Sequence, residues 1–205
     1  TASASGTLGA AALDNSGRVV LLNGRTGDRV TLSGAYTGAG PSSLSFDAVM
    51  GVDDGAADRL TAAATAGHST VSFQNVSSAK VYFDTPIVLI ASQGGEGRFT
   101  ASTDATTQAA LASQGIVDYR FGHITGGHDW GIIASVNTAA AASVAGHAAA
   151  VTTTLNNGVF ADTADLIGHP GDEDSWRGQA WARATTGGRT AGVTTTASDP
   201  YAPVD

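Results

Sequence analysis

The sequence predicts a mainly β fold followed by a helix and a further short β segment. Glycine is abundant, with 27 residues in a chain of 205, and charged residues make up only 14%, a composition typical of short strands and tight turns. Residues 43–50 alternate with Leu44, Phe46, Ala48 and Met50 on one face, as a half-buried strand does. After residue 135 the chain becomes rich in alanine, the best helix former. We therefore expect a β domain over residues 1–135, a helix over 136–170 and a second β region over 171–205.

Turn residues divide the β domain into short segments. The expected strands cover residues 18–22, 28–32, 43–50, 70–76, 80–83, 87–90, 98–100, 116–121 and 129–133. Residues 101–113 carry no strand signal and are expected to form a loop or a short helix bulging from the sheet. Alternating early strands and the continuous apolar run Ile87–Ile90 fit either a sandwich or a stack of parallel coils, and periodicity alone does not choose between them. Successive turns show no fixed repeat length, which excludes the nonapeptide repeat of calcium-loaded β-rolls.

The alanine-rich segment has a thin apolar stripe. Val144, Ala148, Val151, Leu155 and Val159 recur at spacings of three or four residues, as expected for one face of a helix. Because these side chains are small, the helix suits a confined, partly wet lumen better than a large core.

Composition excludes several classes of function. The formal charge is -8 and Lys80 is the only lysine, so the chain lacks the basic surface that binds nucleic acid or anionic lipid. It contains no cysteine, which excludes disulfides and thiolate metal sites. No cofactor is expected. Neither terminus reads as a natural end, so we interpret the sequence as a fragment of a longer protein.

Several short motifs occur in a definite order. They are Gly34-Ala35-Tyr36-Thr37-Gly38, Leu44 to Phe46, Asp58-Arg59-Leu60, Ser72-Phe73-Gln74-Asn75-Val76, Asp118-Tyr119-Arg120-Phe121 with Asp129-Trp130, and Gln179-Ala180-Trp181-Ala182-Arg183 with Gly187-Gly188. In these motifs, which span most of its length, the chain resembles the type Va autotransporters of Gram-negative bacteria. It departs from their pattern where Gly131-Ile132-Ile133 follows Trp130, in place of the usual aromatic residue and leucine.

The resemblance implies a fold for each segment. Residues 1–135 would be the end of a right-handed parallel β-helix, the pertactin-like stem that contains the autochaperone. Residues 136–170 would be the α-helical linker in the barrel pore, and residues 171–205 the truncated start of the translocator β-barrel, marked by Trp181, Arg183, Gly187 and Gly188. The inward column of the stem would consist of Phe46, Phe73, Val88, Ile90, Tyr119 and Trp130.

The resemblance also implies a non-enzymatic function. Such a stem folds outside the cell, and its completed coils template the next ones, so that folding assists export and display of the passenger. The expected location is the outer membrane and cell surface, reached through the periplasm. The expected partners are the chain's own translocator β-barrel and the outer-membrane assembly machinery. A host surface or glycan partner would bind through the passenger.

Two groups of residues raise the question of metal binding. His123 and His128 with Asp129 have metal-ligand types, but without a further ligand at helical spacing we interpret them as an exposed hairpin pair. Asp53, Asp54 and Asp58 lack the spacing and final glutamate of an EF-hand and are read as an acidic turn. We therefore predict no metal site.

Catalytic groups are equally sparse. Asp47, Asp84 and Asp118 could form a polysaccharide-cleaving set, or each could be an outward residue of an alternating strand. No serine lies in a nucleophile elbow. The one candidate reaction centre is the pair Asn156 and Asn157. In those autotransporters that carry serine-protease passengers, such a pair cyclises and releases the passenger, whereas Asn-Gly is also an ordinary helix stop.

Two other function classes stay open. Residues 1–135 could be an adhesin or glycan-binding β-domain, or a β-helix enzyme that degrades polysaccharides. Deletion discriminates between these classes, because loss of an autochaperone impairs folding of a preceding passenger and loss of a binding module does not.

Overall fold

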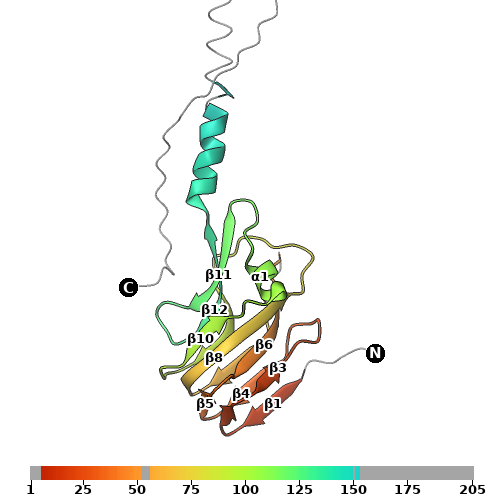
Figure 1. Cartoon of the computed structure of the whole chain (residues 1–205), viewed down its shortest axis with the longest axis vertical. Coiled ribbons are helices and arrows are strands. Elements are labelled where there is room, and N and C mark those ends of the chain that lie inside the picture. The colour runs from red at the N-terminus through yellow and green to blue at the C-terminus, as the bar shows by residue number, and fades with distance from the viewer. Residues whose placement is uncertain (1–5, 52–55, 150, 153–205) are drawn as a thin grey trace, which may run out of the picture. The chain divides into compact units, whose positions relative to one another are not determined.

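The computed structural model describes residues 6–51, 56–149 and 151–152. The chain divides into two compact units, one of residues up to Asn137 and one that begins at Thr138. The first unit is a parallel β-solenoid of about three turns, and Figure 1 shows its strands stacked on one another. This confirms the predicted mainly β class and decides for the parallel stack over the sandwich.

Each turn of the solenoid contributes strands to the same faces. The first turn consists of β1 (Thr7–Ala10), β2 (Leu13–Asn15) and β3 (Arg18–Val20). The second consists of β4 (Arg29–Leu32), β5 (Ala35–Gly38) and β6 (Ser43–Ala48). The third consists of β7 (Arg59–Ala62) and the long β8 (Ala64–Asn75), and a partial turn follows with β9 (Ile87–Ser92) and β10 (Arg98–Ala101).

Parallel pairing in register stacks equivalent residues on one another. In the first sheet Leu8 pairs with Val30, Val30 with Leu60 and Leu60 with Ile90. The last two steps are each 30 residues long and the first is 22, because the turns between strands differ in length. The sheet through β6 and β8 places Phe46 beside Phe73. Since parallel strands bury a continuous column of side chains between turns, this register generates the core.

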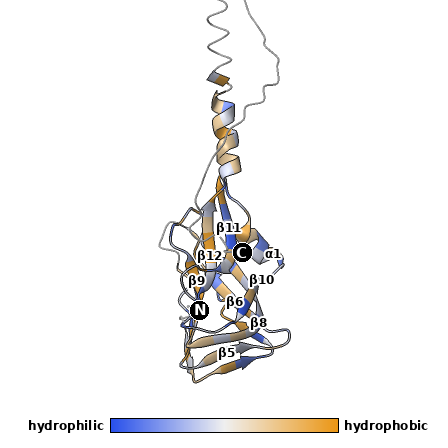
Figure 2. Cartoon of the chain, turned by 90° about the vertical axis from the view of Figure 1, so that its left-hand side faces the viewer, coloured by the Kyte–Doolittle hydropathy of each residue, from blue (hydrophilic) through white to orange (hydrophobic). Residues whose placement is uncertain are grey.

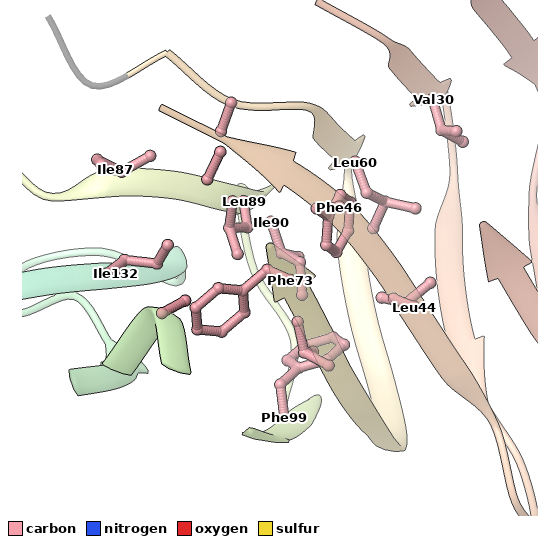
Figure 3. Close-up of a cluster of buried hydrophobic side chains, with 14 of the residues drawn as sticks. Val30, Leu44, Phe46, Leu60, Phe73, Ile87, Leu89, Ile90, Phe99 and Ile132 are labelled. Carbon is pink, nitrogen blue, oxygen red and sulfur yellow. The ribbon is translucent and has the colours of Figure 1, made fainter. Parts of the chain in front are cut away.

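The core is apolar and closely sealed. Figure 3 shows side chains from β4, β6, β7, β8, β9, β10 and β12 converging on a common interior. Phe46 and Phe73 are 1% exposed, and Leu44, Leu60 and Ile90 are fully buried. Polar and apolar residues are interspersed along the strands (Figure 2), as expected when one face of each strand is buried and the other is not.

Two elements close one end of the solenoid. Helix α1 (Ala105–Leu111) follows β10, and the strands β11 (Val117–His123) and β12 (Trp130–Val136) form an antiparallel hairpin. The hairpin joins the first sheet through β12, which pairs antiparallel with β9. The expected short helix over 101–113 is therefore present, but it contacts β8 and β11 and covers the core with Thr107 and Ala110, which are both buried, where a bulge was expected.

The strands differ from the prediction in two places. No strand forms at residues 80–83, because Lys80 and Phe83 turn towards α1 and Tyr119 and the segment crosses from β8 to β9. The strands β1, β2, β5, β7 and the first half of β8 were not predicted. The strands β1, β5, β7 and the first half of β8 are rich in glycine, alanine and threonine, and such small residues give little apolar alternation. The strand β2 has only three residues, Leu13 to Asn15.

The second unit begins with a helix over residues 138–149, and residues 151–152 are also helical. Its residues make hydrogen bonds four positions apart, such as Thr152 Oγ1 to the carbonyl of Ala148 at 2.9 Å. Val144 and Val151 of the expected apolar stripe are 66% and 59% exposed. The remainder of the predicted helix, with Leu155 and Val159, lies outside the described residues.

Candidate functional site

The closed end of the solenoid begins with the capped helix α1. Asp104 is its N-cap residue and accepts hydrogen bonds from the backbone N of Thr107 at 2.9 Å and from Thr107 Oγ1 at 2.8 Å. The same hydroxyl accepts a hydrogen bond from the backbone N of Phe73 at 3.1 Å. Because Thr107 is fully buried, it joins the helix directly to the last full turn of the core.

Lys80 holds the other end of α1. Its ammonium donates to the carbonyl oxygens of Ala109 at 3.1 Å, Ala110 at 3.2 Å and Ala112. These are carbonyls that the last turn of a helix leaves unpaired. The ammonium also lies 4.9 Å from the centre of the Tyr119 ring, within the range of a cation–π interaction. Burial lowers the pKa of Lys80 and raises that of Tyr119.

The hairpin contributes an aromatic cluster. The Phe121 ring lies 5.9 Å from Phe73 and 6.1 Å from Trp130, and Trp130 lies 5.5 Å from Phe99 in an edge-on arrangement. Tyr119 packs 6.0 Å from Phe83. Aromatic pairs at such separations stabilise a fold beyond their buried area. The cluster thus joins β8, β10 and the hairpin at the closed end.

The junction of β12 with β9 explains the departure at Gly131. Trp130 pairs with Ile90 and Gly131 with Val88, so β9 has an extra residue there, a β-bulge. A Cβ atom at Gly131 would lie 2.2 Å from the carbonyl oxygen of Ile87. A larger residue after Trp130 would therefore clash with the backbone of β9.

The opposite end of the solenoid is open. In the described residues, β1 pairs only with β4, β2 only with β5 and β3 only with β6, so each first-turn strand has one unpaired edge. Leu8 is 60% exposed, Val20 52% and Leu22 38%. An edge with apolar neighbours is a surface on which another strand can pair.

A chain of buried polar side chains runs from the open end into the third turn. Asn15 Nδ2 donates to the Tyr36 hydroxyl at 2.9 Å, and that hydroxyl lies 2.7 Å from Ser69 Oγ. Ser69 Oγ in turn lies 2.8 Å from Ser42 Oγ. All four residues are buried. Since a buried polar atom without a partner is costly, this chain fixes the register of the turns.

A second buried polar group consists of three aspartates. Asp47 Oδ2 accepts from the backbone N of Asn23 and Gly24 at 2.7 Å each, and Asp47 Oδ1 from Gln74 Nε2 at 2.6 Å. Asp58 accepts from the backbone N of Asp28 and of Asp47. Burial raises the pKa of Asp58, and those amide hydrogen bonds act in the opposite direction.

These contacts bear on the acidic candidates. Asp47 lies opposite Gln74 on the polar face of its strand, as the alternation predicts, but the backbone of residues 23–25 covers it completely. Asp118 accepts a hydrogen bond from Ser113 Oγ at 2.6 Å, and Asp84 is exposed. Asp58 belongs to the buried group, whereas Asp53 and Asp54 lie outside the described residues. The arrangement of Asp47 and Asp58 serves to anchor the loop before β4.

The predicted column residues fall into two groups. Phe46, Phe73, Ile90 and Tyr119 are buried. Val88 and Trp130 are half-buried, and the expectation for Val88 is wrong because the bulge in β9 buries Ile87 and Leu89 instead. Trp130 packs over the end of the column through its contacts with Phe99 and Phe121.

The histidines of the hairpin are placed as expected. His123 and His128 are exposed on either side of the hairpin turn, and His123 lies 5.3 Å from the Trp130 ring. Asp129 Oδ1 accepts a hydrogen bond from the backbone N of Ser92 at 2.9 Å, which ties the hairpin to β9. Among the residues that the structure describes, no group of three or more His, Cys, Asp or Glu side chains could hold a metal ion.

The remaining predicted site residues lie outside the described residues. These are the self-cleavage candidates Asn156 and Asn157 and the barrel-start residues Trp181, Arg183, Gly187 and Gly188.

The roles of Lys80 and of the buried aspartates were not predicted from the sequence. A single lysine in a chain with few charges was the available signal for Lys80. For Asp28 and Asp58 the signal was their identical position before Arg29 and Arg59, which pair in register.

Comparison with known proteins does not assign this chain to a family. In the described residues no helix is long and apolar enough to cross a membrane. No family model matches the chain, and no curated protein matches it.

Proposed function

We propose that this chain is the folding stem of a longer, surface-displayed solenoid of the autotransporter kind. In this proposal the stem is a right-handed β-helix, the helix from residue 138 belongs to the linker, and the stem itself catalyses no reaction. Residues up to Asn137 fold first and stay folded outside the cell, which assists export of the passenger.

One observation carries the proposal, namely the difference between the two ends. At one end α1, Lys80 and the hairpin cover the core. At the other end three strands have an edge that pairs with no other strand of the described residues, and Leu8, Val20 and Leu22 lie exposed beside it. A solenoid turn needs a neighbour to bury its apolar face. The closed end supplies that neighbour for the last turns, and the open end offers one to a preceding turn.

The proposal has a direct test in a Gram-negative host. The full-length protein, or this chain placed after a reporter solenoid, is displayed with Trp130→Ala, Tyr119→Ala or no change. We expect both variants to lower the unfolding midpoint of the stem and to reduce the protease-resistant passenger at the surface. If the parent and the two variants showed equal amounts of passenger at the surface and equal unfolding midpoints, the proposal would be refuted.

A deletion separates this function from a binding module. Removal of residues 98–136, which include α1 and the hairpin, should leave a preceding solenoid passenger sensitive to protease. A passenger that folds and resists protease equally well without these residues would favour a binding module.

A further inference from the structure

The outer face of the sheet formed by β3, β6, β8 and β10 carries rows of hydroxyl groups. Arg18 pairs with Ser43, Ser43 with Thr70 and Thr70 with Thr100 in consecutive strands. A second row contains Ser45 and Ser72, whose hydroxyls lie 2.7 Å apart. These residues alternate with the buried Leu44, Phe46, Val71 and Phe73. Because side chains alternate between the two faces of a strand, both rows lie on the outer face of the sheet, where Ser45 is covered at 1% exposure and Ser43, Thr70 and Ser72 are half-buried.

This face is hollowed into a groove of about 360 Å³. Ser43, Thr70, Ser72 and Gln74 lie on the strands beneath it, and Arg18 and Leu22 line it on the side of the open end. On the side of the closed end it is lined by Ser102 and Asp104, which precede α1, and by Thr106 in the first turn of α1. The groove therefore runs from β3 across β6 and β8 to the segment that follows β10. With neighbouring strands roughly 4.8 Å apart, it extends about 14 Å.

Several polar groups of the groove are available to a ligand. Within residues 6–51 and 56–149, the side chains of Arg18, Ser43, Thr70 and Thr106 make no hydrogen bond or ion pair. Asp104 accepts from Thr107, and Ser72 and Gln74 bond to Ser45 and Asp47, so these three are held in place. Fixed polar groups beside free hydroxyls can bind a ligand that both donates and accepts hydrogen bonds.

The charges of the groove favour a neutral ligand. Among the residues that the structure describes, Arg18 is the one cationic residue that lines it, and the Asp104 carboxylate lies on the opposite side. Hydrogen bonds from Ser102 and Thr107 lower the pKa of Asp104, which keeps it ionised. The chain as a whole carries a net charge of -8. The Asp104 carboxylate and the net negative charge would both repel a polyanion, whereas the hydroxyls of a neutral sugar chain can form hydrogen bonds with the hydroxyls of the groove.

We propose that this groove binds a linear, neutral oligosaccharide of about three sugar units along the stack of strands. The hydroxyls of Ser43, Thr70 and Ser72 contact the sugar hydroxyls. Arg18 donates to ring or hydroxyl oxygens, and Leu22, which is 38% exposed, packs on a sugar face. Phe73, the aromatic lining residue, is 1% exposed and offers no stacking surface. Binding therefore depends on hydrogen bonds, and it is independent of the proposed role in export.

The test uses the whole chain and named sugars. Isotope-labelled protein is titrated by NMR with cellohexaose, maltohexaose, mannohexaose and N-acetylchitohexaose, and with a polygalacturonate hexamer as the anionic comparator. We expect at least one neutral sugar to shift the amide signals of Ser43, Thr70 and Ser72 in a saturable way. No saturable shift with any neutral sugar, or shifts with polygalacturonate only, would overturn the proposal.

Variants locate the site. Thr70→Val and Arg18→Gln should each weaken binding at least fivefold. Thr70→Val removes a hydroxyl with little change in volume, and Arg18→Gln replaces the guanidinium, with its five N–H donors, by a shorter neutral amide. Thr37→Val, in β5 of a different face and also half-buried, is the matched control and should bind as the parent does. If Thr37→Val weakens binding as much as Thr70→Val, or if Thr70→Val and Arg18→Gln both bind normally, the groove is not the site. A Thr70→Ser variant, which retains the hydroxyl, should bind within twofold of the parent and excludes a loss caused by misfolding.

Discussion

The two ends of the solenoid should respond very differently to the loss of an apolar side chain. Phe73 is 1% exposed and lies where the third turn, α1 and the hairpin meet, whereas Leu8 on β1 is 60% exposed. Truncation of a buried phenylalanine to alanine costs about 3–5 kcal/mol, because apolar contacts are lost and a cavity remains. A domain of ordinary stability has only about 5–15 kcal/mol in total. We therefore expect Phe73→Ala to remove a large part of the stability, and Leu8→Ala to cost less than about 0.5 kcal/mol.

Urea unfolding followed by far-UV circular dichroism measures this difference. With a urea dependence of about 2 kcal/mol per molar, Phe73→Ala should lower the midpoint by roughly 1.5–2.5 M and Leu8→Ala by about 0.2 M or less. If Phe73→Ala does not fold, Phe73→Leu keeps most of the volume and should lose about 1–1.5 kcal/mol. If Phe73→Ala and Leu8→Ala lowered the midpoint equally, the inference that side chains at the closed end contribute more to stability than those at the open end would be refuted.

Three further predictions address other contacts. Gly67→Ala should lower the free energy of unfolding by about 3 kcal/mol or more, because φ is +73° and the new Cβ atom would lie 1.9 Å from the Gly38 carbonyl oxygen. Gly24→Ala has a similar φ of +81° but open space around it, so it should lower the free energy of unfolding by only about 1–2 kcal/mol. Equal losses for the two variants in calorimetry would contradict this prediction. Lys80→Met should cost roughly 1–3 kcal/mol and speed hydrogen exchange in α1, with the exposed Arg98→Met as a control that leaves exchange unchanged. Burial raises the folded-state pKa of Asp58 above 3.8, so its contribution to stability is complete below that value and is lost as the pH rises through the folded-state pKa. Asp58→Asn should therefore remove a fall in stability with rising pH. Hydrogen bonds from Ser102 and Thr107 lower the pKa of Asp104, so Asp104→Asn should remove a rise in stability with rising pH. Urea midpoints that change with pH in the same way for both variants would contradict this prediction.

Large apolar residues made the strands of the core predictable from the sequence. Residues 43–50 alternate and Ile87–Ile90 is a continuous apolar run, and both positions are strands in the structure. By contrast, β5 and the first half of β8 consist mostly of alanine, glycine and threonine. Such strands form because they pair with neighbouring turns, and that information is distributed over residues about 30 positions apart. A local pattern does not contain it.

The closed end was only partly predictable for a similar reason. The hairpin was visible in the strand patterns of residues 116–121 and 129–133, and the burial of Tyr119 followed from the expected column. The position of Val88 was wrong, because a bulge depends on how β12 meets β9 and not on the order of residues in β9. Nor does the sequence around Lys80 indicate its partners, since α1 lies some 30 residues further along the chain.

The burial of Asp47 shows the same limit. Alternation placed it correctly on the polar face of β6, but the loop that covers it comes from the preceding turn. The local sequence thus predicts on which face of a strand a polar residue lies. Its exposure to solvent depends also on loops from neighbouring turns of the solenoid.

The reversal of strand direction at β12 has a consequence for self-association. A purely parallel stack has two different ends that fit one another, so copies of it could add head to tail without limit. Here β12 runs against β9, and β11, the outermost strand of that sheet, carries Asp118 and Arg120. Charged residues on an edge strand discourage pairing with a second molecule. A chain built this way can lengthen from one end while the other resists fibre formation.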